Sequence, residues 1–176
     1  MHKIEIVIGT MRQGAYSRKA GLVVFDIYKS LGADVGLIDL KDMSKDAFLP
    51  EAYEDRPRAI GEFSDRLLAA AGVVIVTPEY NSSLPGVLKH FIDLWKFPDT
   101  FKRKFCLVGV SNGRWGGIRA LEHLGSLLLN RGANVFPEKS FLPDCEELFD
   151  ESGNIKDEKA KGRLERQARN FLEFLK

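Results

Sequence analysis

The chain has 176 residues, about the length of one domain. Apolar residues make up 44% and charged residues 29%, a composition typical of a soluble globular protein, which excludes disorder along the whole chain. The formal net charge of +1 argues against a dedicated nucleic-acid or membrane-surface protein. The two cysteines, Cys106 and Cys145, are too few for a disulfide framework or a four-thiolate metal site.

No targeting or membrane-spanning segment is recognisable. The short apolar run at the start of the chain is not followed by a secretory cleavage site, and no apolar stretch reaches the roughly 18 residues of a membrane span. We therefore expect a cytoplasmic protein with no membrane or nucleic-acid partner. The histidines at positions 2, 90 and 123 match no metal-binding spacing, so no metal is expected.

Short β-branched runs alternate with longer amphipathic segments. The predicted strands are apolar runs, at residues 4–8, 34–40, 73–77, 105–110 and 133–136. The predicted helices have apolar residues three and four positions apart, at residues 17–31, 58–71, 85–96, 117–131 and 155–175. Residues 41–57 and 137–154 contain prolines and many polar residues, and we expect them to be irregular connections.

Five strands that alternate with helices indicate βαβ units and a mostly parallel sheet. Right-handed crossovers then favour a doubly wound α/β fold, a three-layer sandwich with helices on both faces of the sheet. In open sheets of this kind, ligands bind beyond the carboxyl ends of the strands. The loops that follow the first, third and fourth predicted strands are therefore the candidate site.

The first loop, residues 9–17, leaves a strand and opens a helix. The hydroxyls of Thr10 and Ser17, the guanidinium of Arg12 and the backbone N–H groups at the helix start all suit a phosphate. The loop is not a Walker A loop, because the required Lys-Ser or Lys-Thr pair is missing. A phosphate-binding loop is the preferred interpretation, and a simple helix cap is the alternative.

The second loop, residues 77–86, is stiffened by two prolines. Tyr80 offers a planar surface beside Pro78 and Glu79, and Asn81 offers both a donor and an acceptor. A preorganised edge for a ligand and an ordinary turn with an exposed tyrosine are both compatible with this composition.

The third loop, residues 109–117, contains a Gly-x-Ser-x-Gly motif around Ser111 between a strand and a helix. This is the context of a hydrolase nucleophile, which requires an acid and then a histidine later in the chain. His123, only twelve residues on and inside a predicted helix, is the sole later histidine, so a serine esterase is kept only as an alternative. The preferred interpretation is a glycine-rich loop that lets a flat ligand approach the backbone, with Trp115 beside it.

Together, the three loops resemble the NAD(P)H-dependent FMN reductase family, a flavodoxin-like group that includes quinone, chromate and azo-dye reductases. The most specific element is Thr77-Pro78-Glu79-Tyr80-Asn81 followed by Leu84-Pro85-Gly86. The Gly-Thr-x-Arg-x-Gly loop is similar to the family's phosphate loop, and Gly113 with Gly116-Gly117 is similar to its third flavin loop. The resemblance implies one flavodoxin-like FMN-binding domain over residues 1–176, with a five-stranded parallel sheet in the order 2-1-3-4-5.

The resemblance also implies an oxidoreductase that binds FMN and receives hydride from NADPH or NADH. The acceptor would be a small molecule such as a quinone, free flavin, azo compound or metal oxyanion. The implied FMN-binding residues lie on the three loops: Thr10, Arg12, Tyr16, Ser17, Pro78, Glu79, Tyr80, Asn81, Ser111, Gly113, Trp115, Gly116 and Gly117. No catalytic side chain is expected, because the cofactor carries the chemistry. Many members have Ser and Asn where this chain has Ala15 and Ser17, which puts one phosphate contact in doubt.

Two other function classes stay open: a flavodoxin-like electron carrier with a protein partner, and a binding module that has lost flavin. Electron carriers of this type are usually acidic, and the net charge of +1 offers no acidic docking face. The intact first and second loops argue against loss of flavin. Arg114, Arg119 and the run 102–104 are candidates to contact the 2′-phosphate of NADPH.

A homodimer or homotetramer is also implied, with the predicted helices at 85–96 and 117–131 as the interface. The first of these helices is apolar around much of its circumference, which is more than one contact with the sheet requires. The residues that suggest this are Leu88, Phe91, Ile92, Leu94 and Trp95.

Overall fold

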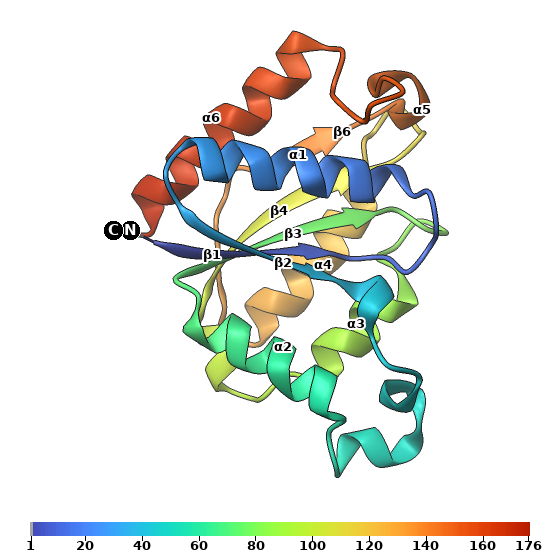
Figure 1. The fold of residues 1–176 in the computed structure, drawn as a ribbon, viewed down its shortest axis with the longest axis vertical. Coiled ribbons are helices and arrows are strands. Elements are labelled where there is room, and N and C mark those ends of the chain that lie inside the picture. The colour runs from blue at the N-terminus through green and yellow to red at the C-terminus, as the bar shows by residue number, and fades with distance from the viewer. Residues whose placement is uncertain (1) are drawn as a thin grey trace.

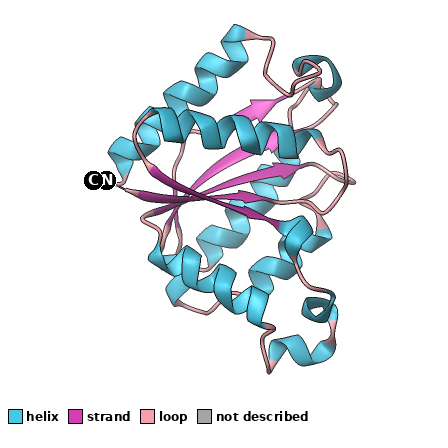
Figure 2. Cartoon of the chain, viewed as in Figure 1, coloured by secondary structure: helices cyan, strands magenta, loops and turns pink. Residues whose placement is uncertain are grey.

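The computed structural model describes residues 2–176 as a parallel β-sheet with helices on both faces (Figures 1 and 2). The strands are β1 (Lys3–Ile8), β2 (Asp34–Asp39), β3 (Gly72–Pro78), β4 (Lys104–Val110), β5 (Asn134–Val135) and β6 (Ser140–Leu142). They lie in the order β2-β1-β3-β4-β5, and β6 also pairs with β4. The predicted strand order 2-1-3-4-5 is confirmed, and every pairing between strands is parallel.

Two helical layers cover the sheet. One face carries α1 (Tyr16–Ser30) and α6 (Glu158–Phe174), and the other carries α2 (Arg58–Ala69), α3 (Gly86–Asp93) and α4 (Ile118–Asn130) (Figure 1). These are the five predicted helices, with ends that differ by at most three residues. The short helix α5 (Cys145–Leu148) follows β6. All seven residues of β3 are buried, as the consecutive apolar residues 73–76 predict for a central strand.

The connection between β2 and α2 is more regular than expected. It contains three short 3₁₀ helices, η1 (Leu40–Asp42), η2 (Lys45–Phe48) and η3 (Pro50–Tyr53). A fourth, η4 (Asp99–Lys102), lies between α3 and β4. The ring of His90 on α3 fixes the first connection, because its Nε2 lies 2.5 Å from the Ala47 carbonyl and its face stacks on Phe48. His90 is therefore an anchor for this loop.

The fifth position of the sheet differs from the single strand predicted at 133–136. β5 pairs only with the first two residues of β4, and β6 pairs with the last three. Between the two, residues 137–139 leave the sheet. The sheet thus has six strands, and the segment 137–154 contains a strand and a helix where an irregular connection was expected.

Gln167 of α6 fills the gap between β5 and β6. Its side chain is 2% exposed, and its Nε2 donates to the backbone carbonyl of Leu107 at 3.1 Å and to that of Glu138 at 2.7 Å. A side-chain amide thereby supplies the donors that a continuous strand would supply from its backbone.

The apolar residues of α3, and the two that directly follow it, do not form an exposed apolar surface. Leu88, Phe91, Ile92, Leu94 and Trp95 are each at most 3% exposed and belong to the core of this chain. Trp95 alone packs against three other aromatic rings. The expectation that these five residues face another subunit is therefore wrong, because α3 is enclosed by the sheet and neighbouring segments.

Candidate functional site

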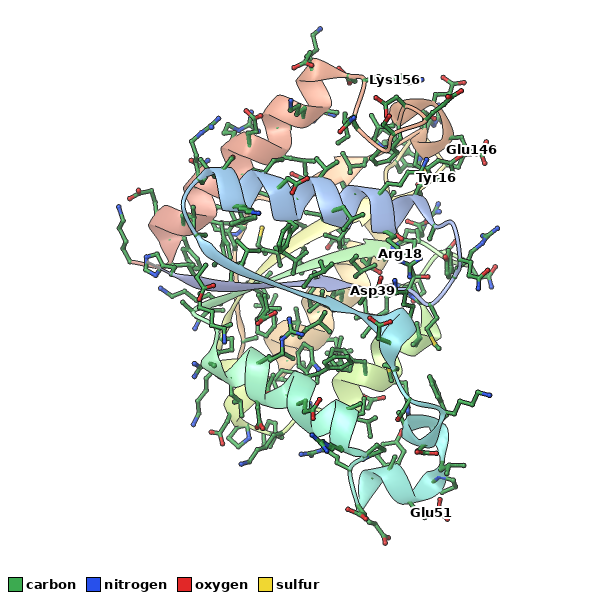
Figure 3. The ribbon with its side chains drawn as sticks, in the orientation of Figure 1. Tyr16, Arg18, Asp39, Glu51, Glu146 and Lys156 are labelled. Carbon is green, nitrogen blue, oxygen red and sulfur yellow. The ribbon has the colours of Figure 1, made fainter. Side chains whose placement is uncertain are left out.

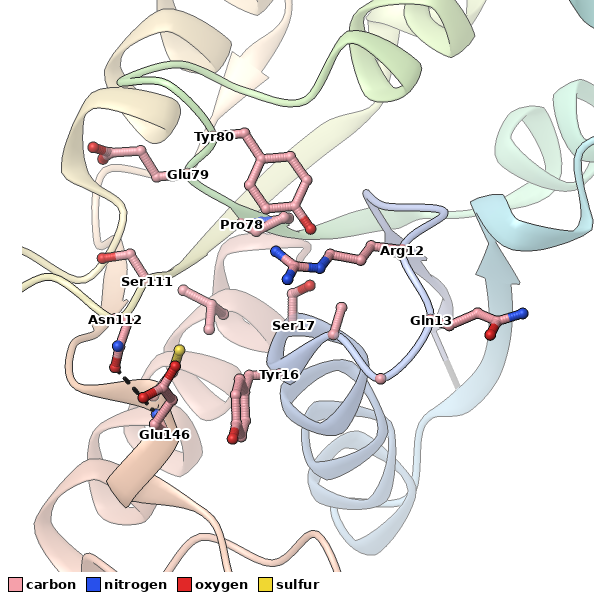
Figure 4. A pocket seen from close by; sticks show the side chains of 14 residues that line it. Arg12, Gln13, Tyr16, Ser17, Pro78, Glu79, Tyr80, Ser111, Asn112 and Glu146 are labelled. Carbon is pink, nitrogen blue, oxygen red and sulfur yellow. Dashed lines mark hydrogen bonds between the residues drawn. The ribbon is translucent and has the colours of Figure 1, made fainter.

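A cavity of about 280 Å³ lies where the loops after β1, β3 and β4 converge at the carboxyl edge of the sheet. Tyr16, Arg18, Asp39 and Glu146 lie along this edge (Figure 3), and Figure 4 shows the cavity from close by. The predicted site residues that line it are Arg12, Tyr16, Ser17, Pro78, Glu79, Tyr80 and Ser111. The predicted residues that do not line it are Thr10, Asn81, Gly113, Trp115, Gly116 and Gly117.

Ser17 is the most telling residue of the first loop. It is 1% exposed, and its Oγ has no hydrogen-bond partner among the described residues although it lines the cavity. Leaving such a hydroxyl unpaired costs about 1–3 kcal/mol. Ala15, the N-cap of α1, makes no side-chain cap, so no capping side chain accepts from the N–H groups of the first helical turn, whose residues Tyr16 and Ser17 line the cavity.

Thr10 joins the first loop to the second. Its Oγ1 accepts a hydrogen bond from the Arg12 N–H at 3.1 Å and lies 3.1 Å from the Tyr80 hydroxyl. Because Thr10 is itself buried, it sets the position of Arg12 and Tyr80 and does not line the cavity.

Arg18, which was not among the predicted site residues, also holds the first loop. Its guanidinium bonds both oxygens of Asp39, at 2.7 and 3.0 Å, and donates to the carbonyl of Arg12 at 2.9 Å. Burial alone would raise the pKa of the Asp39 carboxyl, but the hydrogen bonds from Arg18 and the Lys41 N–H hold this pKa below its usual value. Arg18 and Asp39 meet only because the strand order places the ends of β1 and β2 side by side.

The second loop is a tight two-residue turn. Tyr80 and Ser83 exchange backbone hydrogen bonds of 2.9 and 3.0 Å, and Asn81 and Ser82 have φ angles of +48° and +62°. Positive φ at both central residues defines a type I′ turn, which asparagine tolerates well. Asn81 therefore has a role in shaping the turn that holds Tyr80 beside the cavity.

Glu79 connects the second loop to α4. Its carboxylate accepts hydrogen bonds from the Arg119 N–H at 3.0 Å and from the Arg119 guanidinium at 3.3 Å. Glu79 thus places a negative charge at the N-terminus of α4, where the helix dipole favours one. Arg119 is already paired, which removes it as a free partner for a coenzyme phosphate. The run 102–104 is also excluded as a partner for the coenzyme phosphate. It lies at the start of β4, and the cavity lies at the other end of the strands.

The glycines of the third loop hold it against the sheet. Gly116 and Gly117 have φ angles of +60° and +89°. A Cβ on Gly116 would lie 2.7 Å from the Leu142 nitrogen, and one on Gly117 would lie 2.8 Å from the Val110 nitrogen. Because they have no side chain, these two glycines let the loop pack closely on β4 and β6. They do not line the cavity, where they were expected to let a flat ligand approach the backbone.

The loop gives no support to a serine esterase. The Ser111 hydroxyl donates to the Gly113 carbonyl at 3.0 Å. His123, the only candidate base, has its Nδ1 2.9 Å from the Ser83 hydroxyl. Among residues 2–176, no histidine bonds Ser111, so the nucleophile–base contact that this chemistry needs is missing.

The far wall of the cavity comes from the segment 137–154, for which an irregular connection was expected. Cys145 and Glu146 at the start of α5 line it with Asn112, whose Oδ1 lies 3.5 Å from the Glu146 N–H. Burial, and then the charge of Glu146, raises the pKa of the Cys145 thiol to about 11, so the thiol is neutral at pH 7. The remaining lining residues that were not predicted are Gln13, Gly14, Ala15 and Val110.

The described residues offer neither a metal cluster nor a membrane span. In residues 2–176, no group of three or more His, Cys, Asp or Glu side chains is arranged to hold a metal ion. Within the same range, no helix combines the length and the apolar character needed to cross a bilayer.

Comparison with known proteins identifies the family. Residues 2–146 match the family model described as NADPH-dependent FMN reductase. An NAD(P)H-dependent FMN reductase of Pseudomonas aeruginosa is 30% identical over 176 residues, which cover 94% of this chain and 90% of that protein. A quinone reductase of Escherichia coli is 30% identical over 186 residues, which cover 98% of this chain and 96% of that protein.

A solved structure shows the same fold. The flavoenzyme FerB of Paracoccus denitrificans, an NAD(P)H:acceptor oxidoreductase, superposes with a TM-score of 0.83 at 22% identity, covering 99% of this chain and 97% of that one. The sequence-based prediction of a flavodoxin-like oxidoreductase is confirmed. The chain belongs to the NADPH-dependent FMN reductase family, whose members use FMN and NAD(P)H.

Proposed function

We propose that residues 1–176 form one FMN-binding domain, with the FMN phosphate on the first loop and the flavin ring between the second and third loops. The observation that carries the proposal is the unpaired hydroxyl of Ser17, buried at an uncapped helix N-terminus beside Arg12. A phosphate dianion would accept from the hydroxyl, the N–H groups and the guanidinium together. The donor set therefore fits the phosphate of FMN.

The second and third loops would hold the ring by being rigid before it arrives. Tyr80 is fixed by Thr10, and Glu79 is fixed by Arg119. Pro78 and Ser111 line the space between the two loops. FMN, when bound, supplies hydride transfer, and the protein supplies binding and orientation. The reaction would oxidise NADPH or NADH by two electrons and pass them to a small acceptor such as a quinone, free flavin, azo compound or metal oxyanion.

We infer a homodimer or homotetramer as the working assembly. With the core residues of α3 excluded, the support for this comes from Leu129 on α4 and Phe97 after α3, which are 61% and 60% exposed. An assembly would cover these two side chains, which both expose apolar surface to water. A monomeric mass by light scattering at micromolar concentration would count against the assembly.

The first experiment is an absorption spectrum of the purified protein, with FMN added, before and after anaerobic NADPH. Flavin bands that sharpen on binding and bleach with NADPH are the expected result. No binding of added FMN would overturn the proposal.

Two variants test the phosphate contacts. Arg12→Met should weaken FMN binding about tenfold or more, while Arg56→Met, at an exposed arginine outside the cavity, should not. Ser17→Ala is sharper, because it removes a hydroxyl that is unpaired without ligand. It should leave the stability of the flavin-free protein unchanged or higher and still weaken FMN binding. Equal FMN affinity in all three variants would contradict the assigned phosphate site.

A further inference from the structure

A second cavity, of about 350 Å³, opens between the third loop, β6 and α6. Its wall combines the aromatic side chains of Trp115 and Phe141 with cationic side chains from three elements. The cations are Arg114, Lys139, Arg163 and Arg166. We refer to it as the arginine–tryptophan cavity.

Two of these four cationic side chains have no ion-pair partner among residues 2–176. Lys139 pairs with Glu122 at 2.7 Å, and Arg166 pairs with Glu138 at 3.0 Å. Neither Arg114 nor Arg163 forms an ion pair with any residue of the range 2–176. Two guanidinium groups with no carboxylate partner therefore face one cavity, an arrangement that favours an anionic ligand.

Trp115 adds a flat surface to this site. Its side chain is 59% exposed, and the Arg114 guanidinium lies 5.3 Å from the centre of its ring. The exposed indole ring leaves apolar area in contact with water, and an aromatic ring stacked on it would cover that area. A ligand that carries both an aromatic ring and a phosphate would use both parts of the cavity.

The two cavities are lined by different residues of the same two chain segments. Ser111 and Cys145, which line the FMN cavity, are joined by a 3.2 Å hydrogen bond from the Cys145 N–H to the Ser111 carbonyl. Pro143 and Arg114, which line the arginine–tryptophan cavity, stand two or three residues away along the same segments. This separation spans about 10 Å at most. A molecule with one end at the flavin can therefore reach the second cavity.

We propose that the arginine–tryptophan cavity binds the adenosine 2′-phosphate of NADPH and makes the enzyme prefer NADPH to NADH. The inference rests on the proposed function. A phosphomonoester carries nearly two negative charges at pH 7 and matches the fork of a guanidinium, while adenine would stack on Trp115. Two riboses and a pyrophosphate separate the nicotinamide from the 2′-phosphate, which suits two cavities on either side of one loop. NADH has a hydroxyl in place of this phosphate and would leave both arginines unpaired.

Coenzyme kinetics test the proposal. In Arg163→Gln and Arg114→Gln, the ratio of kcat/KM for NADPH to that for NADH should fall about tenfold or more, with little change for NADH. Arg169→Gln is the matched control, because Arg169 stands on the same helix but outside the cavity and pairs with Glu165. Equal loss for both coenzymes would assign the arginines to the shared pyrophosphate and overturn the proposal.

A binding measurement separates this inference from the proposed function. By calorimetry, 2′,5′-ADP should bind the protein more tightly than 5′-AMP, and the difference should disappear in Arg163→Gln. Equal binding of the two nucleotides would overturn the 2′-phosphate assignment even where both coenzymes reduce the flavin. If neither coenzyme reduces bound FMN while 2′,5′-ADP still binds preferentially, the proposed function fails and the anion site stands.

Discussion

Arg18 forms a bidentate ion pair with Asp39, with N–O distances of 2.7 and 3.0 Å, which joins the start of α1 to the end of β2. The same guanidinium reaches the carbonyls of Arg12 and Thr10, at 2.9 and 3.4 Å. The pair is largely buried, with side-chain exposures of 18% and 7%. It therefore holds the first loop in shape, and neither of its two residues lines the cavity.

Arg18→Met should lower the free energy of unfolding by about 1.5–3 kcal/mol, because it leaves the Asp39 carboxylate buried without its partner. It should also weaken FMN binding, since the carbonyls of the loop lose their donor. Urea unfolding and FMN titration measure the two effects. Arg58→Met, which removes an exposed ion pair with Glu62, is the control and should change neither appreciably. Arg18→Lys should not restore FMN binding, because an ammonium group cannot form the bidentate contact that a guanidinium makes with a carboxylate.

The Asp39 carboxyl should make part of the stability dependent on pH. Its pKa is lowered in the fold, so the stability it contributes is present above the unfolded-state pKa of about 3.9 and is lost as the pH falls through the folded value. The gap in unfolding free energy between the parent protein and Asp39→Asn should therefore be constant near neutral pH and shrink below about pH 4. A gap that stays constant to pH 3 in denaturant titrations would contradict this assignment.

Gly117→Ala should destabilise the protein by at least about 1–2 kcal/mol, because alanine resists a φ of +89° and its Cβ would meet the backbone of β4. Gly113→Ala is a matched control in the same loop. A Cβ there meets only the Ser111 hydroxyl oxygen, at 3.7 Å, and the φ angle of Gly113 is not positive. Thermal or urea unfolding should separate the two variants. Equal effects would mean that the loop adapts to a side chain at either position.

Gln167→Leu should lower the free energy of unfolding by at least about 1–3 kcal/mol, because two backbone carbonyls lose their shared donor inside the protein. Hydrogen exchange should show the loss first in β6, which α6 supports. Asn170→Leu, on the same helix but exposed, removes only a surface hydrogen bond to Glu138 and is the control. Unchanged protection of β6 in Gln167→Leu would show that the amide is not needed to hold the split strand.

Cys145 should alkylate slowly in the folded protein. With a pKa of about 11, its thiolate fraction at pH 8 is a few hundred-fold smaller than that of a free cysteine with a pKa of about 8.5. The rate with iodoacetamide, read by peptide mass mapping, should rise about tenfold per pH unit and fall when FMN is present. Cys145→Ser gives the background from the buried Cys106. Rapid modification at pH 8 would contradict the protonated state.

The parts of the fold that sequence predicts well are those decided by neighbours along the chain. β3 is an uninterrupted apolar run and is buried throughout, and the first two loops carry their chemistry in consecutive residues. Arg18 and Asp39 escape prediction because 21 positions separate them and only strand order joins them. β6 escapes because the residue that completes its sheet position, Gln167, lies on the last helix. Cys145 and Glu146 follow β6 and were missed with it.

The split at the fifth position also affects how the molecule meets others of its kind. A long, flat outer strand presents a row of free backbone donors and acceptors that can pair with another sheet and start aggregation. In the described chain this edge is broken into pieces of two and three residues, with α6 reaching across the interval. Neither piece is long enough to template a foreign strand. The interruption between β5 and β6 thus also protects one border of the sheet.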